Sequence, residues 1–147
     1  MTDLFEFTPD ATTFAVMGNP VKHSKSPQIH DMFARHCGVS MDYQAIQVDS
    51  GGFEQAVSHF AAHGGGGLNI TVPYKVEAWM LCQRSGNQCS ERAGLTEAVN
   101  TLRFEKNGII AGDNTDGIGM VTDIQQNIGC SLGGRSILVI GAGGAVR

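Results

Sequence analysis

Apolar residues in the first half of the chain follow two patterns in turn, a short strand-like run and a helically spaced set. The short runs, at residues 12–17, 43–48 and 68–73, have the length of strands; the first is a buried apolar run, and the last one ends in a loop. Each run precedes a segment whose apolar residues recur every three or four positions, as on one face of a helix. These sets are Ile29, Met32, Phe33 and Cys37; Phe53, Ala56, Val57, Phe60 and Ala61; and Val76, Trp79 and Met80. Three strand-then-helix units in succession predict an α/β fold with a mainly parallel mixed sheet flanked by helices.

The second half of the chain predicts a hairpin and two more helices. A short helix is expected at residues 91–94, and residues 115–127 are expected to form another. Between them, two strand-like segments flank Lys106-Asn107-Gly108, and an Asn-Gly pair is typical of a tight hairpin turn.

The last residues predict the beginning of a second domain. After the glycine-rich residues 129–134, an apolar strand runs into a turn of small residues. A phosphate-binding turn of this kind precedes a helix, so we expect the natural protein to continue past Arg147. We predict one whole domain at residues 1–128 and the first strand and turn of a second, Rossmann-type domain at residues 135–147.

The composition favours a compact globular protein. Hydrophobic residues make up 41% and charged residues 16% of the 147 positions, which is enough apolar material for a core. The net charge of −4 and the lack of a basic stripe argue against a nucleic-acid partner. No apolar run is long enough for a membrane span, and the acidic start lacks the features of a secretory signal. We therefore expect a cytoplasmic protein without nucleic-acid or membrane partners, whose oligomeric state the sequence does not determine.

The cysteines and histidines show no metal-site pattern. The cysteines lack CxxC spacing and fall in or beside predicted helices, so we expect buried, reduced thiols rather than a disulfide framework or a zinc site. They are Cys37, Cys82, Cys89 and Cys130. His59 and His63 are four residues apart on a predicted helix, but without a third ligand nearby they favour a solvated helix face.

The stretch NPVKHSKSP, residues 19–27, places two serines at the start of a predicted helix. Pro27 is typical of a first helical turn, and Ser26 is a favoured cap for it. Capping does not explain Ser24. Hydroxyls, free backbone N–H groups and the positive end of the helix dipole together form a site for a carboxylate or a phosphate. From this stretch alone, a simple cap and an anion site are both open, and the cap is the commoner arrangement.

Polar residues also gather where the third predicted strand ends. Asn69 and Thr71 point to one face of the strand, at the end where open α/β sheets bind ligands. Lys75 follows in the first turn of a helix, where the helix dipole disfavours a cation. A partly desolvated lysine there would have a lowered pKa and could exchange a proton with a ligand oxygen. The alternative is an exposed lysine that curls back into water.

The motif GDNTDG, residues 112–117, is the third polar cluster. Thr115 or Asp116 would cap the next helix, but a cap does not explain two aspartates and an asparagine around one threonine. A carboxylate near Lys75 would form the acid/base pair that oxidation of a hydroxyl to a carbonyl needs. Asn100 adds an amide that both donates to and accepts from a hydroxyl.

Five motifs in this order resemble the shikimate dehydrogenase family: GNPVKHSKSPQIH, NITVPYK, AVNT, GDNTDG and GAGGAVR, within residues 14–147. The resemblance implies an NADP-dependent oxidoreductase of aromatic amino acid (chorismate) biosynthesis that interconverts 3-dehydroshikimate and shikimate. It implies a substrate domain with a mixed sheet, joined to a Rossmann-type cofactor domain, with the active site between them. Because the family's cofactor-reading segments lie beyond Arg147, this chain alone is expected to bind substrate without hydride transfer.

The resemblance also assigns roles to the residues in these motifs. The substrate-binding set is Ser24, Ser26, Asn69, Thr71, Lys75, Asn100 and Asp116, and the cofactor-binding set is Glu91, Gly141, Ala142, Gly143, Gly144 and Ala145. The two serines and Thr71 are implied to hold the substrate carboxylate, and the amides and Asp116 to contact the ring hydroxyls or their neighbours. Lys75 is implied to be the catalytic acid/base, coupled to Asp116.

Two rival functions remain. A quinate/shikimate dehydrogenase has the same chemistry but a broader substrate range, and such relatives tend to replace the Asn-x-Thr pair that NITVPYK retains. A non-catalytic binding module would keep the carboxylate pocket without chemistry. The presence of both Lys75 and Asp116 argues against that module, because binding alone does not need a proton-transfer pair.

Overall fold

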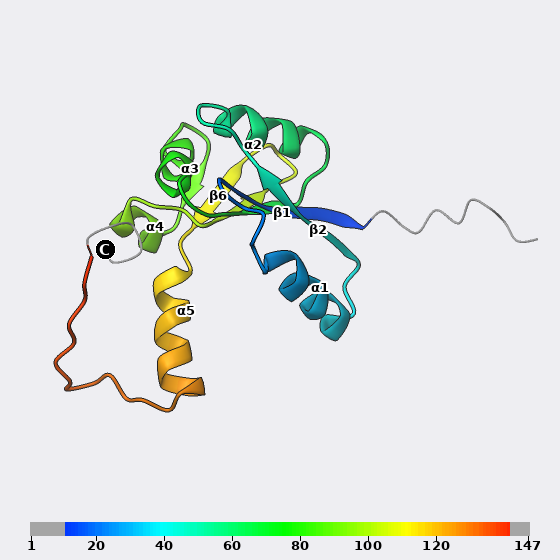
Figure 1. The fold of residues 1–147 in the computed structure, drawn as a ribbon. Coiled ribbons are helices and arrows are strands. Elements are labelled where there is room, and N and C mark those ends of the chain that lie inside the picture. Colours follow the sequence, from blue (N-terminus) through cyan, green and yellow to red (C-terminus); the bar gives the residue numbers. More distant parts are fainter. Residues whose placement is uncertain (1–10, 142–147) are drawn as a thin grey trace, which may run out of the picture.

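The computed structural model describes residues 11–141 and contains a single six-stranded sheet with the strand order β2-β1-β3-β5-β6-β4 (Figure 1). The strands are β1 (Thr12–Gly18), β2 (Met41–Gln47), β3 (Gly67–Ile70), β4 (Gln88–Cys89), β5 (Thr101–Phe104) and β6 (Ile110–Asp113). The helices are α1 (Ser26–Cys37), α2 (Phe53–Ala62), α3 (Lys75–Cys82), α4 (Glu91–Thr96) and α5 (Asp116–Thr122), followed by a π-helical segment, η1 (Asp123–Asn127). The predicted α/β fold is confirmed.

The sheet is mixed, as the sequence predicted. Strand β1 pairs in parallel with β2 and β3, and β4 pairs in parallel with β6. Strand β5 is antiparallel to both of its neighbours, β3 and β6. With β6 it forms the predicted hairpin. The first three strands are joined by helical crossovers, which is the connection that parallel neighbours need.

The helices lie on both sides of the sheet. In Figure 1, α2 and α3 lie together on one side, and α1 lies on the other side, next to β2. Helix α5 extends from the end of β6 away from the sheet, and none of its residues is buried (Figure 1). Within the described residues, no helix is long and apolar enough to cross a membrane.

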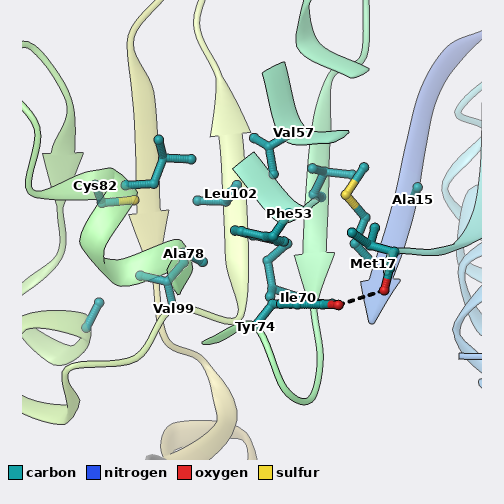
Figure 2. Packing of buried hydrophobic residues seen from close by; sticks show 14 residues of the cluster. Ala15, Met17, Phe53, Val57, Ile70, Tyr74, Ala78, Cys82, Val99 and Leu102 are labelled. Atoms are coloured by element: carbon teal, nitrogen blue, oxygen red, sulfur yellow. Dashed lines mark hydrogen bonds between the residues drawn. The ribbon is translucent and has the colours of Figure 1, made fainter. Parts of the chain in front are cut away.

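The core lies between the sheet and the α2–α3 layer (Figure 2). Phe53 at the start of α2 stacks on Tyr74 just before α3, with ring centroids 5.0 Å apart. The Tyr74 hydroxyl is buried and donates a hydrogen bond to the Val48 carbonyl oxygen at 2.6 Å. Met17 of β1 and Leu102 of β5 close the cluster from the sheet side. One aromatic stack thus links the starts of α2 and α3 above β1, β3 and β5.

We expect Tyr74→Phe to lower the free energy of unfolding by about 1 kcal/mol, because the variant loses one buried hydrogen bond. The ring and its stack on Phe53 are retained. Urea denaturation followed by circular dichroism measures the change. An unaltered midpoint would show that water or a neighbouring group replaces the bond.

Two helices bury other residues than the sequence predicted. On α1, Met32 is 69% and Phe33 is 60% exposed, and Ala34 is the buried residue. The physical reason is that α1 packs mainly against β2, at the edge of the sheet, where it meets little apolar surface.

On α3 the buried residues are Ala78, Leu81 and Cys82, whereas the predicted Val76 and Met80 are exposed. This segment carries two apolar stripes, and the core selects the one in phase with Tyr74.

The expectation of buried cysteines holds for one of the four. Cys82 is buried in the core, whereas Cys37 is exposed at the end of α1. Cys89 and Cys130 are partly buried, and all four are free thiols. Burial raises the pKa of the Cys82 thiol to about 11, with a further contribution from Cys89, so it packs as a neutral side chain.

The predicted strand after residue 135 is not formed. Residues 135–141 contain neither helix nor strand in the described structure, and Leu138 and Ile140 are 85% and 90% exposed. A strand needs a neighbour for its backbone N–H and C=O groups, and none of the described strands pairs with this segment. Residues 142–145 of the predicted turn lie outside the described residues. The division at residue 128 therefore stays a prediction.

Candidate functional site

Polar residues from three strands, β3, β5 and β6, meet at one end of the sheet. The carboxyl ends of the parallel strands β1 and β3 lie at that end of the sheet. Because β5 is antiparallel to both β3 and β6, it starts there and β6 ends there, so Asn69 pairs with Thr101 and Thr101 pairs with Asp113. The antiparallel hairpin thus brings the AVNT and GDNTDG motifs beside NITVPYK. Local sequence patterns did not reveal this arrangement.

Lys75 and Asp116 form an ion pair at this end of the sheet. The Lys75 Nζ lies 2.6 Å from Asp116 Oδ2, and the two side chains are 23% and 33% exposed. Both residues are the first of their helices, α3 and α5. The Lys75 carbonyl oxygen accepts a hydrogen bond from Val99 N–H at 2.8 Å, which ties the start of α3 to the segment before β5. A proton donor and a carboxylate are therefore paired, and both are accessible to a ligand.

Asn100 holds the other oxygen of Asp116. Its Nδ2 donates to Asp116 Oδ1 at 2.7 Å and to Thr115 Oγ1 at 3.0 Å. Its Oδ1 accepts from Thr101 Oγ1 at 2.9 Å and from Thr115 N–H at 3.0 Å. Asn100 is 9% exposed, so nearly all of its hydrogen-bonding capacity serves to hold this end of the sheet together.

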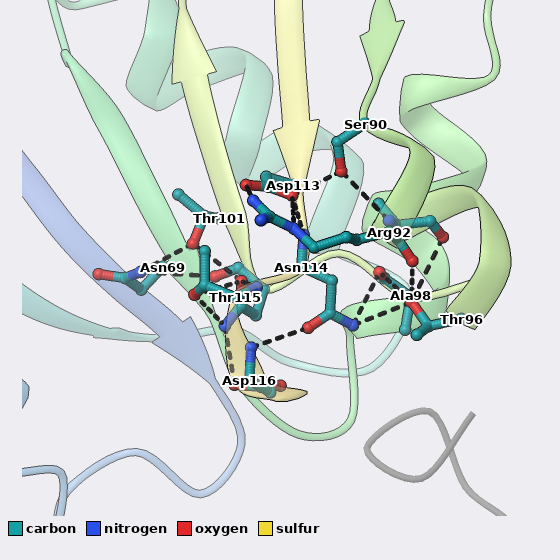
Figure 3. A network of polar contacts seen from close by, with 12 residues as sticks. Asn69, Ser90, Arg92, Thr96, Ala98, Thr101, Asp113, Asn114, Thr115 and Asp116 are labelled. Atoms are coloured by element: carbon teal, nitrogen blue, oxygen red, sulfur yellow. Dashed lines mark hydrogen bonds and ion pairs between the residues drawn. The ribbon is translucent and has the colours of Figure 1, made fainter. Parts of the chain in front are cut away.

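Asn114 fixes the start of α5, a role that the sequence assigned to Thr115 or Asp116. Thr115 occupies the cap position but its side chain makes no capping bond. Instead the buried Asn114 accepts from Asp116 N–H at 3.1 Å and donates to the Ala98 carbonyl oxygen at 3.2 Å (Figure 3). A third bond joins it to Thr96 Oγ1. Asn114 takes this role for a steric reason, since the turn after β6 points Asn114 inward and leaves Thr115 exposed.

Asp113 belongs to a separate polar contact that anchors α4. It accepts from Ser90 Oγ at 2.5 Å and from Asn114 N–H at 2.8 Å, and it pairs with Arg92 (Figure 3). Burial raises the pKa of Asp113, but the bonds from Arg92, Ser90 and the Asn114 N–H lower it more, so the pKa lies below its usual range. Asp113 is therefore a structural carboxylate, while Asp116 faces Lys75.

At the start of α1 the N-cap position is Lys25, and Ser24 rather than Ser26 bonds a free N–H of the first turn. The helix begins at Ser26, and the Ser24 Oγ accepts a hydrogen bond from Ser26 N–H at 3.2 Å. Ser26 is the first helical residue rather than the cap. Its backbone N–H has no partner within the helix, and Ser24 supplies the acceptor. The Ser26 hydroxyl lies near Tyr43 and lowers the pKa of its phenol, against the larger effect of burial.

Thr71 lies one residue past the end of β3, against β1. Its N–H donates to the Met17 carbonyl oxygen at 2.9 Å, and its methyl carbon would lie 2.3 Å from a Cβ placed on Gly18. Only glycine therefore fits at position 18 with Thr71 in this position. The next residue, Val72, is 60% exposed because the strand has ended.

Tyr43 is a residue of this region that sequence reasoning missed. Its hydroxyl donates to Asn69 Oδ1 at 2.7 Å, and Asn69 Nδ2 donates to Thr101 Oγ1 at 3.3 Å. A tyrosine in an edge strand is ordinary by pattern, so only the packing of three strands reveals the contact. The alternation of β2 places it on the α1 side, which was the one available signal.

The described residues contain no metal cluster and only part of the predicted cofactor-binding set. Among residues 11–141, no cluster of three or more histidine, cysteine or carboxylate side chains could hold a metal ion. His59 and His63 are exposed and stack on each other with ring centroids 4.0 Å apart. Glu91 is exposed in the first turn of α4, and Gly141 is the one described residue of the predicted NADP turn. Most of the predicted NADP-binding residues, positions 142–145, therefore lie outside the described part of the chain.

A comparison with known protein families finds one that matches this chain. The family model of the shikimate dehydrogenase substrate-binding domain matches residues 16–102, more than half of the chain. This chain belongs to the shikimate dehydrogenase family. The match includes Ser24, Asn69 and Lys75 and ends within β5.

Curated members of the shikimate dehydrogenase family are similar over most of this chain. It is 56% identical to the shikimate dehydrogenase (NADP(+)) of Alkalilimnicola ehrlichii over 134 residues, which cover 91% of this chain and 48% of that protein. The corresponding protein of Hahella chejuensis is 52% identical over 91% of this chain and 48% of its own length. The chain thus spans about half the length of the curated relatives it matches.

Solved structures of other proteins share the fold. An Ael1 enzyme from Pseudomonas putida superposes with a TM-score of 0.85 at 44% identity, over 92% of this chain and 48% of that one. Shikimate 5-dehydrogenase from Thermus thermophilus, solved in complex with shikimate, gives a TM-score of 0.80 at 31% identity, over 91% and 49% of the two chains.

Proposed function

We propose that this chain is the substrate-binding domain of an NADP-dependent shikimate dehydrogenase, which interconverts 3-dehydroshikimate and shikimate. The observation that carries the proposal is the Lys75–Asp116 ion pair, 2.6 Å long and partly exposed, beside the amides of Asn69 and Asn100. An acid/base pair next to groups that bind hydroxyls suits the oxidation of a ring alcohol. The relatives' names, and shikimate in the solved Thermus protein, support the choice of ring.

The proposed ligand lies between the start of α1 and the start of α5. Ser24 and Ser26 hold its carboxylate together with Thr71, because hydroxyls at a helix start complement a negative charge. Asn69, Asn100 and Asp116 contact the ring hydroxyls. Carboxylate recognition and hydroxyl recognition are thus assigned to opposite ends of one row of polar residues.

Lys75 is proposed to move the proton. During oxidation it accepts the hydroxyl proton as the carbonyl forms, and during reduction it returns that proton to the oxygen. Asp116, hydrogen-bonded to Asn100, holds the lysine in place and balances its charge. NADP supplies the hydride acceptor or donor of the reaction. We assign the turn at residues 141–145 and Glu91 to its binding, within a Rossmann-type domain that starts near residue 135.

We expect this chain to bind shikimate, and Ser24→Ala to weaken binding about tenfold, because a hydrogen bond to a carboxylate is among the stronger ones. Titration of the labelled chain with shikimate, followed by amide NMR shifts, measures the affinity. Ser58→Ala, on the exposed side of α2, is the matched control and should bind as the unaltered chain does. An unaltered chain that folds and shows no saturable shifts would contradict the proposal.

The same titration with quinate separates the broader quinate/shikimate dehydrogenase from the shikimate-specific enzyme. Tighter binding of shikimate than of quinate supports the specific enzyme, whereas equal affinities favour the broader one.

The compartment is proposed to be the cytoplasm, since cysteines without disulfide or metal spacing are usual in a reducing environment. The acidic composition supports a small molecule, rather than nucleic acid or a membrane, as the partner.

A further inference from the structure

Tyr43 reaches across the sheet from its edge. It lies in β2, opposite Phe14 of β1, and β1 in turn separates it from β3. The ring stacks on the His30 imidazole of α1, with centroids 4.0 Å apart and planes 10° apart. The tyrosine hydroxyl therefore extends past β1 to Asn69 Oδ1, which it meets at 2.7 Å. The stack on α1 holds the ring in the direction that this contact requires.

The Tyr43 hydroxyl makes the shortest hydrogen bond to the Asn69 amide. On its other side, Asn69 Nδ2 donates to Thr101 Oγ1 at 3.3 Å and to the Asn100 carbonyl oxygen at 3.5 Å. An amide can turn its oxygen and nitrogen end for end, and its neighbours decide between the two orientations. The Tyr43 donor and the Asn100 carbonyl acceptor favour the same one, with Oδ1 toward β2 and Nδ2 toward β5.

This bond is the first in a directed series that ends at the ion pair. Asn69 donates to Thr101, Thr101 Oγ1 donates to Asn100 Oδ1 at 2.9 Å, and Asn100 Nδ2 donates to Asp116 Oδ1 at 2.7 Å. Each group accepts from the preceding member and donates to the next. Such series strengthen cooperatively inside proteins. A change at Tyr43 is therefore passed on by way of Asn69.

The surroundings keep Tyr43 a donor. Burial raises the pKa of Tyr43 to about 12, although the Ser26 hydroxyl acts in the opposite direction. The phenol thus stays protonated at neutral pH. Tyr43, Asn69 and Thr101 also line a hollow of about 330 Å³ on the α1 side of the sheet.

We propose that Tyr43 is a positioning residue, whose hydroxyl holds the Asn69 amide in the one orientation that recognises a ligand hydroxyl. The proposal rests on the proposed function, because Asn69 is assigned there to a ring hydroxyl. Tyr43 itself acts through Asn69.

A double-mutant cycle tests whether Tyr43 acts through Asn69. The chain and its variants Tyr43→Phe, Asn69→Ala and the double variant are titrated with shikimate. We expect Tyr43→Phe to weaken binding about fivefold in the unaltered background, as for the loss of one hydrogen bond. In the Asn69→Ala background the same change should alter affinity less than about twofold, because coupled residues are not additive.

Two controls separate positioning from a general structural role. Tyr74→Phe removes the same atom from the other tyrosine of the chain, whose hydroxyl bonds to Val48 in the core, and should not change affinity. Cyclohex-1-ene-1-carboxylate carries the ring and the carboxylate but no hydroxyl. Its affinity should change less than about twofold in Tyr43→Phe, because it makes no bond to the Asn69 amide.

The side-chain amide signal of Asn69 provides a readout without ligand. In Tyr43→Phe this signal should shift, while that of Asn87, bonded to the Leu81 carbonyl, should not. If the unaltered chain does not bind shikimate, the proposed function fails, and the amide signal still decides the role of Tyr43. Additive losses in the cycle, or an unchanged Asn69 signal, would overturn the proposal.

Discussion

Lys75→Met is expected to lower the turnover of shikimate by about a thousandfold, the middle of the range for a lost acid/base group. Since this chain spans about half of its relatives' length, the assay uses a chimera in which the second half of the Alkalilimnicola ehrlichii protein follows Arg147. Methionine fills a similar volume but cannot carry a proton. Reduction of NADP in the presence of shikimate, followed by absorbance, measures turnover.

Affinity should respond far less than turnover to Lys75→Met. The lysine is assigned mainly to the transition state, so we expect the shikimate Kd to stay within about tenfold. Lys106→Met, an exposed lysine in the hairpin turn between β5 and β6, is the matched control and should leave turnover unchanged. Near-normal turnover of Lys75→Met would refute its assignment. A folded, unaltered chimera that binds both shikimate and NADP without turnover would instead support the non-catalytic module.

Phe53→Ala is expected to lower the free energy of unfolding by about 3–5 kcal/mol, the range for removing a buried phenylalanine. Phe53 is 1% exposed and stacks on Tyr74, so its removal opens a cavity between α2, α3 and the sheet. Because domains of this size are stable by only about 5–15 kcal/mol, the variant should be close to unfolding. Urea denaturation followed by circular dichroism at two temperatures measures the loss.

The chain offers a matched control for Phe53→Ala. Phe33 has the same side chain on α1 but is 60% exposed, so Phe33→Ala should change the free energy of unfolding by less than about 0.5 kcal/mol. Equal losses for the two variants would contradict the assignment of the core to the α2–α3 side. They would also mean that the apolar side of α1 is covered in solution.

The site could be predicted only in part. The end of β3, the start of α1 and the GDNTDG turn were each identified from residues close together in the chain. Tyr43 and Asn114 were missed, because a tyrosine in an edge strand and an asparagine in a turn are common everywhere. Their roles depend on partners such as Asn69 and Ala98, which lie 26 and 16 residues away.

Local patterns by themselves determined the strand-then-helix units, the hairpin at Asn107-Gly108 and the class of the sheet. Each of these depends on the spacing of apolar residues or on turn chemistry within about ten positions, which a sequence displays directly. Tertiary structure decided which apolar stripe of α3 is buried, that Ser24 rather than Ser26 bonds the start of α1, and that Lys75 meets Asp116 across 41 positions. These outcomes depend on strand order and helix phase, because contacts between distant segments exist only after the sheet has aligned them.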